Sequence, residues 1–136
     1  MTRPCLIPLL YLYNIIKKYK WSLLWTLTIL ILTFLPKNEM PSMTFGVKHL
    51  DKAVHFIFYF ILITLYLFES KKGIHRHSWI FGFIMCLVLG IGTEFGQRYL
   101  NMGRNFELAD MMANFLGNIS GLVLFKVLLI RRPREK

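Results

Sequence analysis

The stretch DKAVHFIFYFILITLYLFE, Asp51–Glu69, decides the fold of this chain. It is apolar between Lys52 and Glu69, and a long run with so few charges predicts a membrane-spanning helix. The run is slightly shorter than the ~20 residues that a bilayer requires. Counting back about 20 residues from its end therefore places Asp51 and His55 inside the helix. Ionisable groups at membrane depth are costly, so they predict a functional site.

Three further apolar runs accompany the first: Trp21–Leu35, Trp79–Thr93 and Met111–Ile130. Together the four runs predict an all-α membrane protein, a bundle of four transmembrane helices. A shorter apolar stretch, Leu6–Ile16, is followed by lysines and not by a cleavage site, which favours an extra N-terminal helix that is interfacial or re-entrant. The expected organisation is an N-terminal apolar segment at 1–20, a four-helix domain at 21–130 and a basic tail at 131–136.

The composition agrees with a membrane protein. Of 136 residues, 55% are hydrophobic and 18% are charged, with a mean hydropathy of +0.48. The net charge of +10 comes from basic residues that flank apolar runs, which is typical of membrane anchoring and not of nucleic-acid binding. The two cysteines, Cys5 and Cys86, have neither zinc-ligand spacing nor a disulfide framework.

The basic residues also predict the orientation. Twelve of the 17 lie before Trp21, between Glu69 and Trp79, or in and after the last run. Basic residues concentrate on the cytoplasmic side, so a multi-pass protein with both termini cytoplasmic is expected. The start of the Asp51–Glu69 run, the end of the Trp79–Thr93 run and the start of the Met111–Ile130 run would then face outward.

The polar residues of the chain gather at these outward ends. They form three groups, which are Asp51, Lys52, His55 and Tyr59; Glu94, Gln97 and Arg98; and Arg104, Asp110 and Asn114. Residues four apart on a helix share a face, so Asp51, His55 and Tyr59 form one stripe. In the same way Glu94 shares a face with Gln97 and Arg98, and Asp110 shares a face with Asn114. We expect the stripes to converge in one external pocket that binds a ligand.

Two pairs of glycines follow the small-xxx-small pattern, Gly92 with Gly96 and Gly117 with Gly121. This pattern lets helix backbones approach closely, so we expect helix packing at all four positions.

The ordered motifs resemble the VanZ-like family of small bacterial membrane proteins. They read D-K-x-x-H-F-x-x-Y from Asp51, G-x-x-x-E-x-x-Q from Gly90, and R-x-x-x-x-x-D-x-x-x-N-x-x-G-x-x-x-G from Arg104. The resemblance covers roughly Trp21 to Ile130. It implies a protein of the bacterial cytoplasmic membrane and cell envelope, in a family named for a glycopeptide-resistance component that lowers sensitivity to teicoplanin.

Three functions remain open. In the first, Lys52, Arg98 and Arg104 hold a phosphate or carboxylate of a lipid-linked cell-wall precursor or a glycopeptide antibiotic. In the second, the protein is a membrane enzyme with His55 as general base, Asp51 or Asp110 as its orienter and Glu94 as a second acid–base group. In the third, His55 and Glu94 relay protons in a small carrier, which would require a homodimer because four helices are thin.

Structural explanations also apply to the same residues. Asp51, His55 and Glu94 can simply connect helix ends by hydrogen bonds, and Asp110 can cap its helix. Tyr59 suits packing. Asp51, His55, Glu94 and Asp110 are suitable metal ligands, but no local H-x-x-x-H or E-x-x-H pattern supports a metal, so neither metal nor cofactor is expected.

Overall fold

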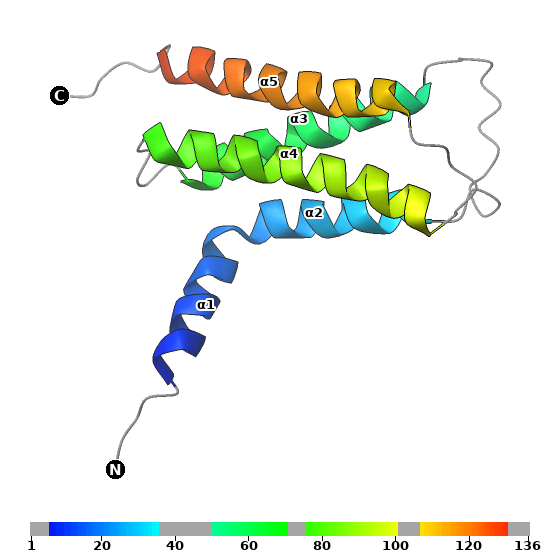
Figure 1. The fold of residues 1–136 in the computed structure, drawn as a ribbon. Helices are drawn as coiled ribbons and strands as arrows, with labels where there is room; N and C mark the ends of the chain where they lie inside the picture. The colour runs from blue at the N-terminus through cyan, green and yellow to red at the C-terminus, as the bar shows by residue number, and fades with distance from the viewer. Residues whose placement is uncertain (1–5, 36–49, 71–75, 101–106, 131–136) are drawn as a thin grey trace.

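The computed structural model describes residues 6–35, 50–70, 76–100 and 107–130. These residues form five helices: α1 (Leu6–Lys18), α2 (Lys20–Thr33), α3 (Leu50–Glu69), α4 (Arg76–Tyr99) and α5 (Leu108–Ile130). The axes of helices α2 to α5 are roughly aligned and form a bundle, whereas α1 leaves the bundle at a steep angle (Figure 1). The expected all-helical class is confirmed for the described part of the chain.

Three of these helices are long and apolar enough to cross a membrane, within Leu50–Glu69, His77–Tyr99 and Leu108–Leu128. Four had been expected. The difference is α2, because its 14 residues extend only about 21 Å at 1.5 Å per residue, against about 30 Å of hydrocarbon. It ends at Thr33, shortly before Pro36, and proline disfavours helical conformation in the residue before it.

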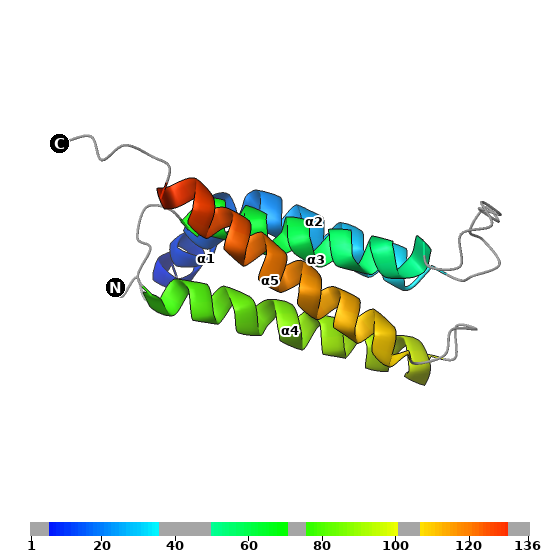
Figure 2. The same ribbon diagram turned by 90° about the horizontal axis from the view of Figure 1, so that it is seen from above.

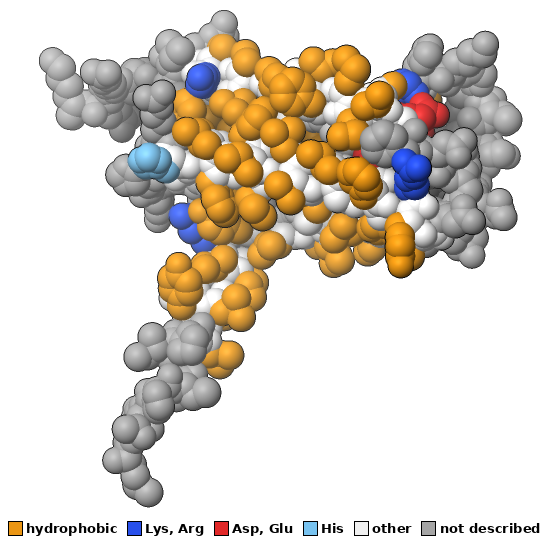
Figure 3. Space-filling view, viewed as in Figure 1, with side chains coloured by type: hydrophobic (Ala, Val, Ile, Leu, Met, Phe, Trp, Pro, Cys, Tyr) orange, Lys and Arg blue, Asp and Glu red, His pale blue; other side chains and the backbone are white. Residues whose placement is uncertain are grey.

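The outside of the bundle is apolar. Large side chains such as Phe81, Val88, Phe95 and Val123 are more than half exposed on α4 and α5. Hydrophobic side chains cover the visible face between the ends of the bundle, and charged side chains lie at the two ends (Figure 3). Such a continuous apolar belt is suited to lipid and not to water.

Helices α3 and α5 pack closest together, and Figure 2 shows α5 running obliquely across α3. A Cβ atom on Gly117 would collide with the Phe56 carbonyl group, and one on Gly121 would lie 2.5 Å from Ile63 Cγ2. Both glycines therefore permit the close approach of the two backbones.

The other glycine pair behaves differently. Gly92 is exposed, and in the described part of the chain nothing lies within 4 Å of the place that its Cβ would occupy. Its expected packing role therefore does not hold, because no helix among the described residues packs against this face of α4. Gly96 lies against the Phe34 ring, which would be 2.8 Å from a Cβ.

The middle of the bundle is an apolar core. Ile29 of α2, Ile63 and Leu67 of α3, and Phe125 of α5 are all fully buried. The Phe125 ring also packs edge-on against Phe68, with centroids 5.2 Å apart. These side chains separate the two ends of the bundle.

At one end, Glu69 joins α3 to α2. Its carboxylate accepts hydrogen bonds from the amides of Trp21 (2.8 Å) and Ser22 (3.0 Å), and from the Ser22 hydroxyl (2.5 Å). Helix N-termini have free amides and a partial positive charge, so a carboxylate there is stabilising. The chain bends at Tyr19, just before this cap, and this bend separates α1 from α2.

Candidate functional site

A group of buried polar side chains lies at the opposite end, between α3, α4 and α5. We call His55, Glu94, Asp110 and Asn114 the polar cluster, and each is at most 6% exposed. The i, i+4 spacing explains the arrangement, because Asp110 and Asn114 share one face of α5 while His55 lies on the buried face of α3. Burying so many polar groups is costly unless each has partners.

His55 is at the centre of the cluster. Its Nδ1 atom lies 3.1 Å from Asn114 Oδ1 and 3.6 Å from Glu94 Oε1. An amide oxygen only accepts hydrogen bonds, so this pairing places the ring proton on Nδ1. Nε2 is then the nitrogen with a lone pair, which can accept a proton or bind a cation.

Asp51, Lys52 and Glu107 lie on the more exposed side of the cluster. Asp51 is exposed, but it, His55 and Asp110 offer ligand atoms that all lie within 4.8 Å of one another. The Lys52 ammonium group donates to Glu107 Oε2 at 2.8 Å and lies 3.6 Å from Asp110 Oδ1. Lys52 is therefore already balanced by carboxylates.

Asp110 is not the N-cap of its helix. Helix α5 begins at Leu108, so Asp110 lies within the first turn, and its amide donates to the Glu107 carbonyl group at 3.0 Å. A carboxylate there still benefits from the helix dipole. However, its buried Oδ1 accepts no hydrogen bond from any described residue.

Tyr59 closes the cluster on the side of the apolar core. Its hydroxyl lies 3.3 Å from Thr93 Oγ1, and the Thr93 hydroxyl donates to the Gly90 carbonyl group at 2.9 Å. Tyr59 is 1% exposed. It thus combines packing with a polar contact, as amphipathic aromatic residues commonly do.

Gln97 and Arg98 lie apart from the cluster. Gln97 donates to the carbonyl group of Thr33 at 2.9 Å and so connects α4 to the end of α2. Arg98 is exposed. Arg104, expected above to bind an anionic group of the ligand, is outside the described residues, as is the basic tail at 131–136.

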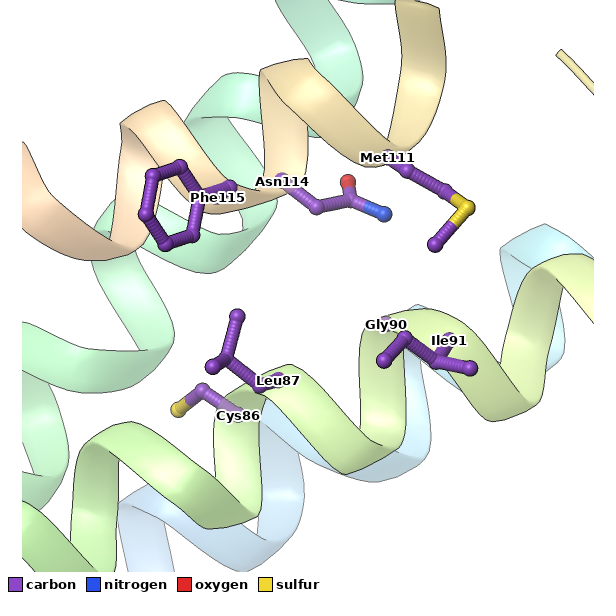
Figure 4. A pocket seen from close by; sticks show the side chains of 7 residues that line it. All are labelled: Cys86, Leu87, Gly90, Ile91, Met111, Asn114 and Phe115. Carbon is purple, nitrogen blue, oxygen red and sulfur yellow. The ribbon is translucent and has the colours of Figure 1, made fainter. Parts of the chain in front are cut away.

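A cavity opens next to the cluster, between α4 and α5 (Figure 4). Its volume is about 150 Å³, and its lining is apolar apart from one amide: Cys86, Leu87, Gly90, Ile91, Met111, Asn114 and Phe115. The Asn114 side chain points into the space between the two helices (Figure 4). Its buried Nδ2 has no hydrogen-bond partner among the described residues, while its Oδ1 faces His55. Asn114 therefore borders both the polar cluster and the apolar cavity.

Several of these contacts involve residues that sequence reasoning missed, namely Thr33, Glu107 and Thr93. Asn118 donates to the carbonyl group of Phe83 at 3.1 Å and connects α5 to α4. The sequence could have indicated Glu107, since it precedes Asp110 by three residues and so lies about one helical turn away. Thr93 had none, because a single threonine at the end of an apolar run resembles the run itself.

The apolar helices and the buried polar cluster at one end are features of a small helical membrane protein. This chain belongs to the VanZ/LLP1 family, whose model matches residues 2–130, and the expected family is confirmed. The match also includes α1, which lay outside the resemblance read from the motifs.

A similar protein occurs in a eukaryote. The chain is 37% identical, over 87 residues, to an uncharacterized protein (C11E3.10) of Schizosaccharomyces pombe. The aligned residues make up 63% of this chain and 52% of the relative. The chain thus spans about half the length of this relative. No solved structure matches the chain.

Proposed function

We propose that this protein binds an amphipathic, lipid-linked molecule in the outer leaflet, such as a cell-wall precursor or a glycopeptide antibiotic that carries a lipid chain. The polar headgroup would lie at the polar cluster, and the lipid chain would lie in the cavity between α4 and α5. The observation that carries the proposal is the position of Asn114, which borders both regions. A ligand with a polar part and an apolar part matches this juxtaposition.

The charges in and around the cluster indicate which kind of headgroup would bind. Carboxylates from Asp51, Glu94, Glu107 and Asp110 outnumber the ammonium group of Lys52. A bare anion would therefore be repelled unless a cation accompanied it. Hydroxyl and amide groups, as in glycans and peptides, suit these acceptors better, and the free Asn114 amide supplies a donor.

The relative in a fission yeast bears on the choice of ligand. A similar protein occurs in a fission yeast, so the first ligand class to test is one that both bacteria and yeast contain, a lipid-linked glycan. Resistance to a glycopeptide would then be one consequence of holding such molecules at the membrane surface.

Binding can be tested with a lipid-linked disaccharide and its two halves. The full molecule should raise the thermal unfolding temperature of the purified protein, whereas the free disaccharide or the lipid chain alone should have little effect. Asn114→Leu should remove the stabilisation. An equal shift with the lipid chain alone would show that the cluster does not take part.

Sensitivity of cells to antibiotic tests the resistance part separately. Cells that produce the protein should tolerate a glycopeptide with a lipid chain better than the same glycopeptide without it. Equal tolerance of both would remove the antibiotic from the ligand class.

The geometry of His55 favours a second candidate, a membrane enzyme. With Nδ1 oriented by Asn114 and Glu94, Nε2 is available as a general base toward a bound headgroup. Incubation with the lipid-linked disaccharide, followed by mass spectrometry, would detect cleavage. Loss of cleavage in His55→Ala, with binding retained, would favour the enzyme over a simple binding protein.

The apolar core argues against a proton-coupled carrier. Ile63, Leu67 and Phe125 are fully buried between the cluster and the Glu69 end. A relay requires polar groups or water along its path.

A further inference from the structure

We propose that Asp51, His55 and Asp110 bind a divalent metal ion of the zinc class. The three side chains come from two helices, with Asp51 and His55 one turn apart on α3 and Asp110 in the first turn of α5. Their ligand atoms all lie within 4.8 Å of one another. Carboxylate oxygen and imidazole nitrogen are both zinc ligands, and three protein ligands leave a fourth position open.

The distances require only a small adjustment. Ligand atoms around a tetrahedral zinc ion with bonds of about 2.1 Å lie roughly 3.4 Å apart. Asp51 is exposed and can rotate toward the other two ligands, whereas His55 and Asp110 are held in place by burial. An ion would therefore bind first to the two fixed ligands, His55 and Asp110, and Asp51 would rotate to complete the site.

A second observation points independently to a ligand at this place. The Oδ1 atom of Asp110 is buried and accepts no hydrogen bond from any described residue, and the Lys52 ammonium group stays 3.6 Å away. A buried carboxylate oxygen without a donor costs free energy. A cation bound between Asp110, His55 and Asp51 would satisfy it.

The surroundings of His55 are those of a metal ligand. Metal-binding histidines usually donate their second ring N–H to a carboxylate or carbonyl oxygen, which fixes the tautomer and the ring orientation. Here Nδ1 lies against Asn114 Oδ1 and Glu94 Oε1, at 3.1 and 3.6 Å, and leaves Nε2 for the ion.

The charge balance also favours a dication. The carboxylates of Asp51, Glu94, Glu107 and Asp110 face one lysine, and like charges this close repel one another. Two positive charges would offset much of this excess. The sequence pattern that belongs to the site is D-x-x-x-H on α3, completed by an aspartate on another helix.

Zinc binding to the purified full chain tests the inference without any lipid substrate. The protein should carry an affinity tag without histidines and be stripped with a chelator. Calorimetry should then give one Zn²⁺ per chain, and Co²⁺ should give the visible absorption of a tetrahedral site. The absence of both signals would overturn the proposal and leave the proposed lipid binding untouched.

Variants distinguish a built site from general attraction to acidic groups. Asp51→Asn and Asp110→Asn should each lower the Zn²⁺ affinity by more than tenfold and abolish the Co²⁺ absorption. Glu94→Gln should lower the affinity by about 10- to 100-fold, as is typical for partners of metal-bound histidines. Glu107→Gln is the matched control, because it removes a neighbouring carboxylate that is not a ligand.

Asp51 is exposed, so its variant should fold even if Asp110→Asn does not. Equal Zn²⁺ affinity in the wild type and Asp51→Asn, or an equal loss in Glu107→Gln, would overturn the proposed ligand set.

Discussion

At the scale of single residues, His55 depends on two neighbours from two other helices. Glu94 of α4 and Asn114 of α5 both approach the same ring nitrogen. The ring can therefore keep one tautomer and one orientation only while all three helices stay in register. A change at either neighbour should alter the chemistry at Nε2 without touching that atom.

Glu94→Gln tests this dependence. The glutamine keeps the shape of the buried side chain, so membrane abundance should be unchanged, while affinity for the lipid-linked disaccharide should fall at least tenfold. Abundance on immunoblots and the ligand-induced shift of the unfolding temperature are the measurements. If abundance and binding decline together, Glu94 is mainly a structural anchor, because losing one partner of a buried pair costs about 3–5 kcal/mol.

Gln97→Leu should show the opposite profile. It removes the hydrogen bond to the carbonyl group of Thr33 and leaves that group without its donor. We expect the free energy of unfolding to fall by about 1–3 kcal/mol, with ligand affinity unchanged. Chemical unfolding in detergent measures the first quantity. A strong loss of affinity at unchanged stability would instead place Gln97 in the ligand site.

At the scale of helices, the contact between α3 and α5 depends on two glycines. Gly117→Ala places a Cβ against the Phe56 carbonyl group, so the helices must separate. Such overpacking typically costs about 1–3 kcal/mol. Thermal unfolding of the purified protein should show the loss.

Gly92→Ala is the matched control for that substitution. The space around Gly92 is open in the described part of the chain, and alanine favours helix over glycine by about 1 kcal/mol. It should leave stability unchanged or raise it slightly. Equal destabilisation by both variants would mean that the two glycines share one role.

The Glu69 cap gives a prediction for α2. Glu69→Ala removes the acceptor for two backbone amides and one hydroxyl, so α2 should begin to fray at its start. Loss of such a cap costs about 0.5–2 kcal/mol. Hydrogen exchange at Trp21 and Ser22 should speed up in the variant. Ser22→Ala keeps the backbone contacts and should change exchange less, and unchanged exchange in both would contradict the cap.

These helices also show what the sequence can predict and what it cannot. The i, i+4 stripe of Asp51, His55 and Tyr59 was readable because it depends only on helical geometry. The partner of Glu69 was not, since Ser22 lies 47 residues away in the chain. Gly92 and Gly117 belong to the same local pattern, yet among the described helices one packs against Gly117 and none against Gly92. That difference is decided by the packing of the whole bundle.

At the scale of the whole molecule, the orientation stays a prediction that labelling can test. The positive-inside rule predicts both termini in the cytoplasm and the polar cluster outside. This requires α2 to cross as well, and α2 does run from the Glu69 end of the bundle to the end near Gln97. After replacement of Cys5 and Cys86, single cysteines at positions 43 and 103 should react with an impermeant reagent from outside, and one at position 73 should not. Labelling at position 73 alone would show that the orientation is the reverse of the predicted one, with the polar cluster facing the cytoplasm.

The cavity between α4 and α5 has a kinetic consequence. Two of its lining residues, Ile91 and Phe115, are exposed on the apolar outside of the bundle, so a lipid chain would enter from within the membrane and not from bulk water. Occupancy would then follow the mole fraction of the ligand among the surrounding lipids. Exchange would be a two-dimensional encounter, limited by diffusion in the plane of the leaflet. Diluting a membrane suspension with buffer should leave occupancy unchanged, whereas adding unrelated lipid should lower it.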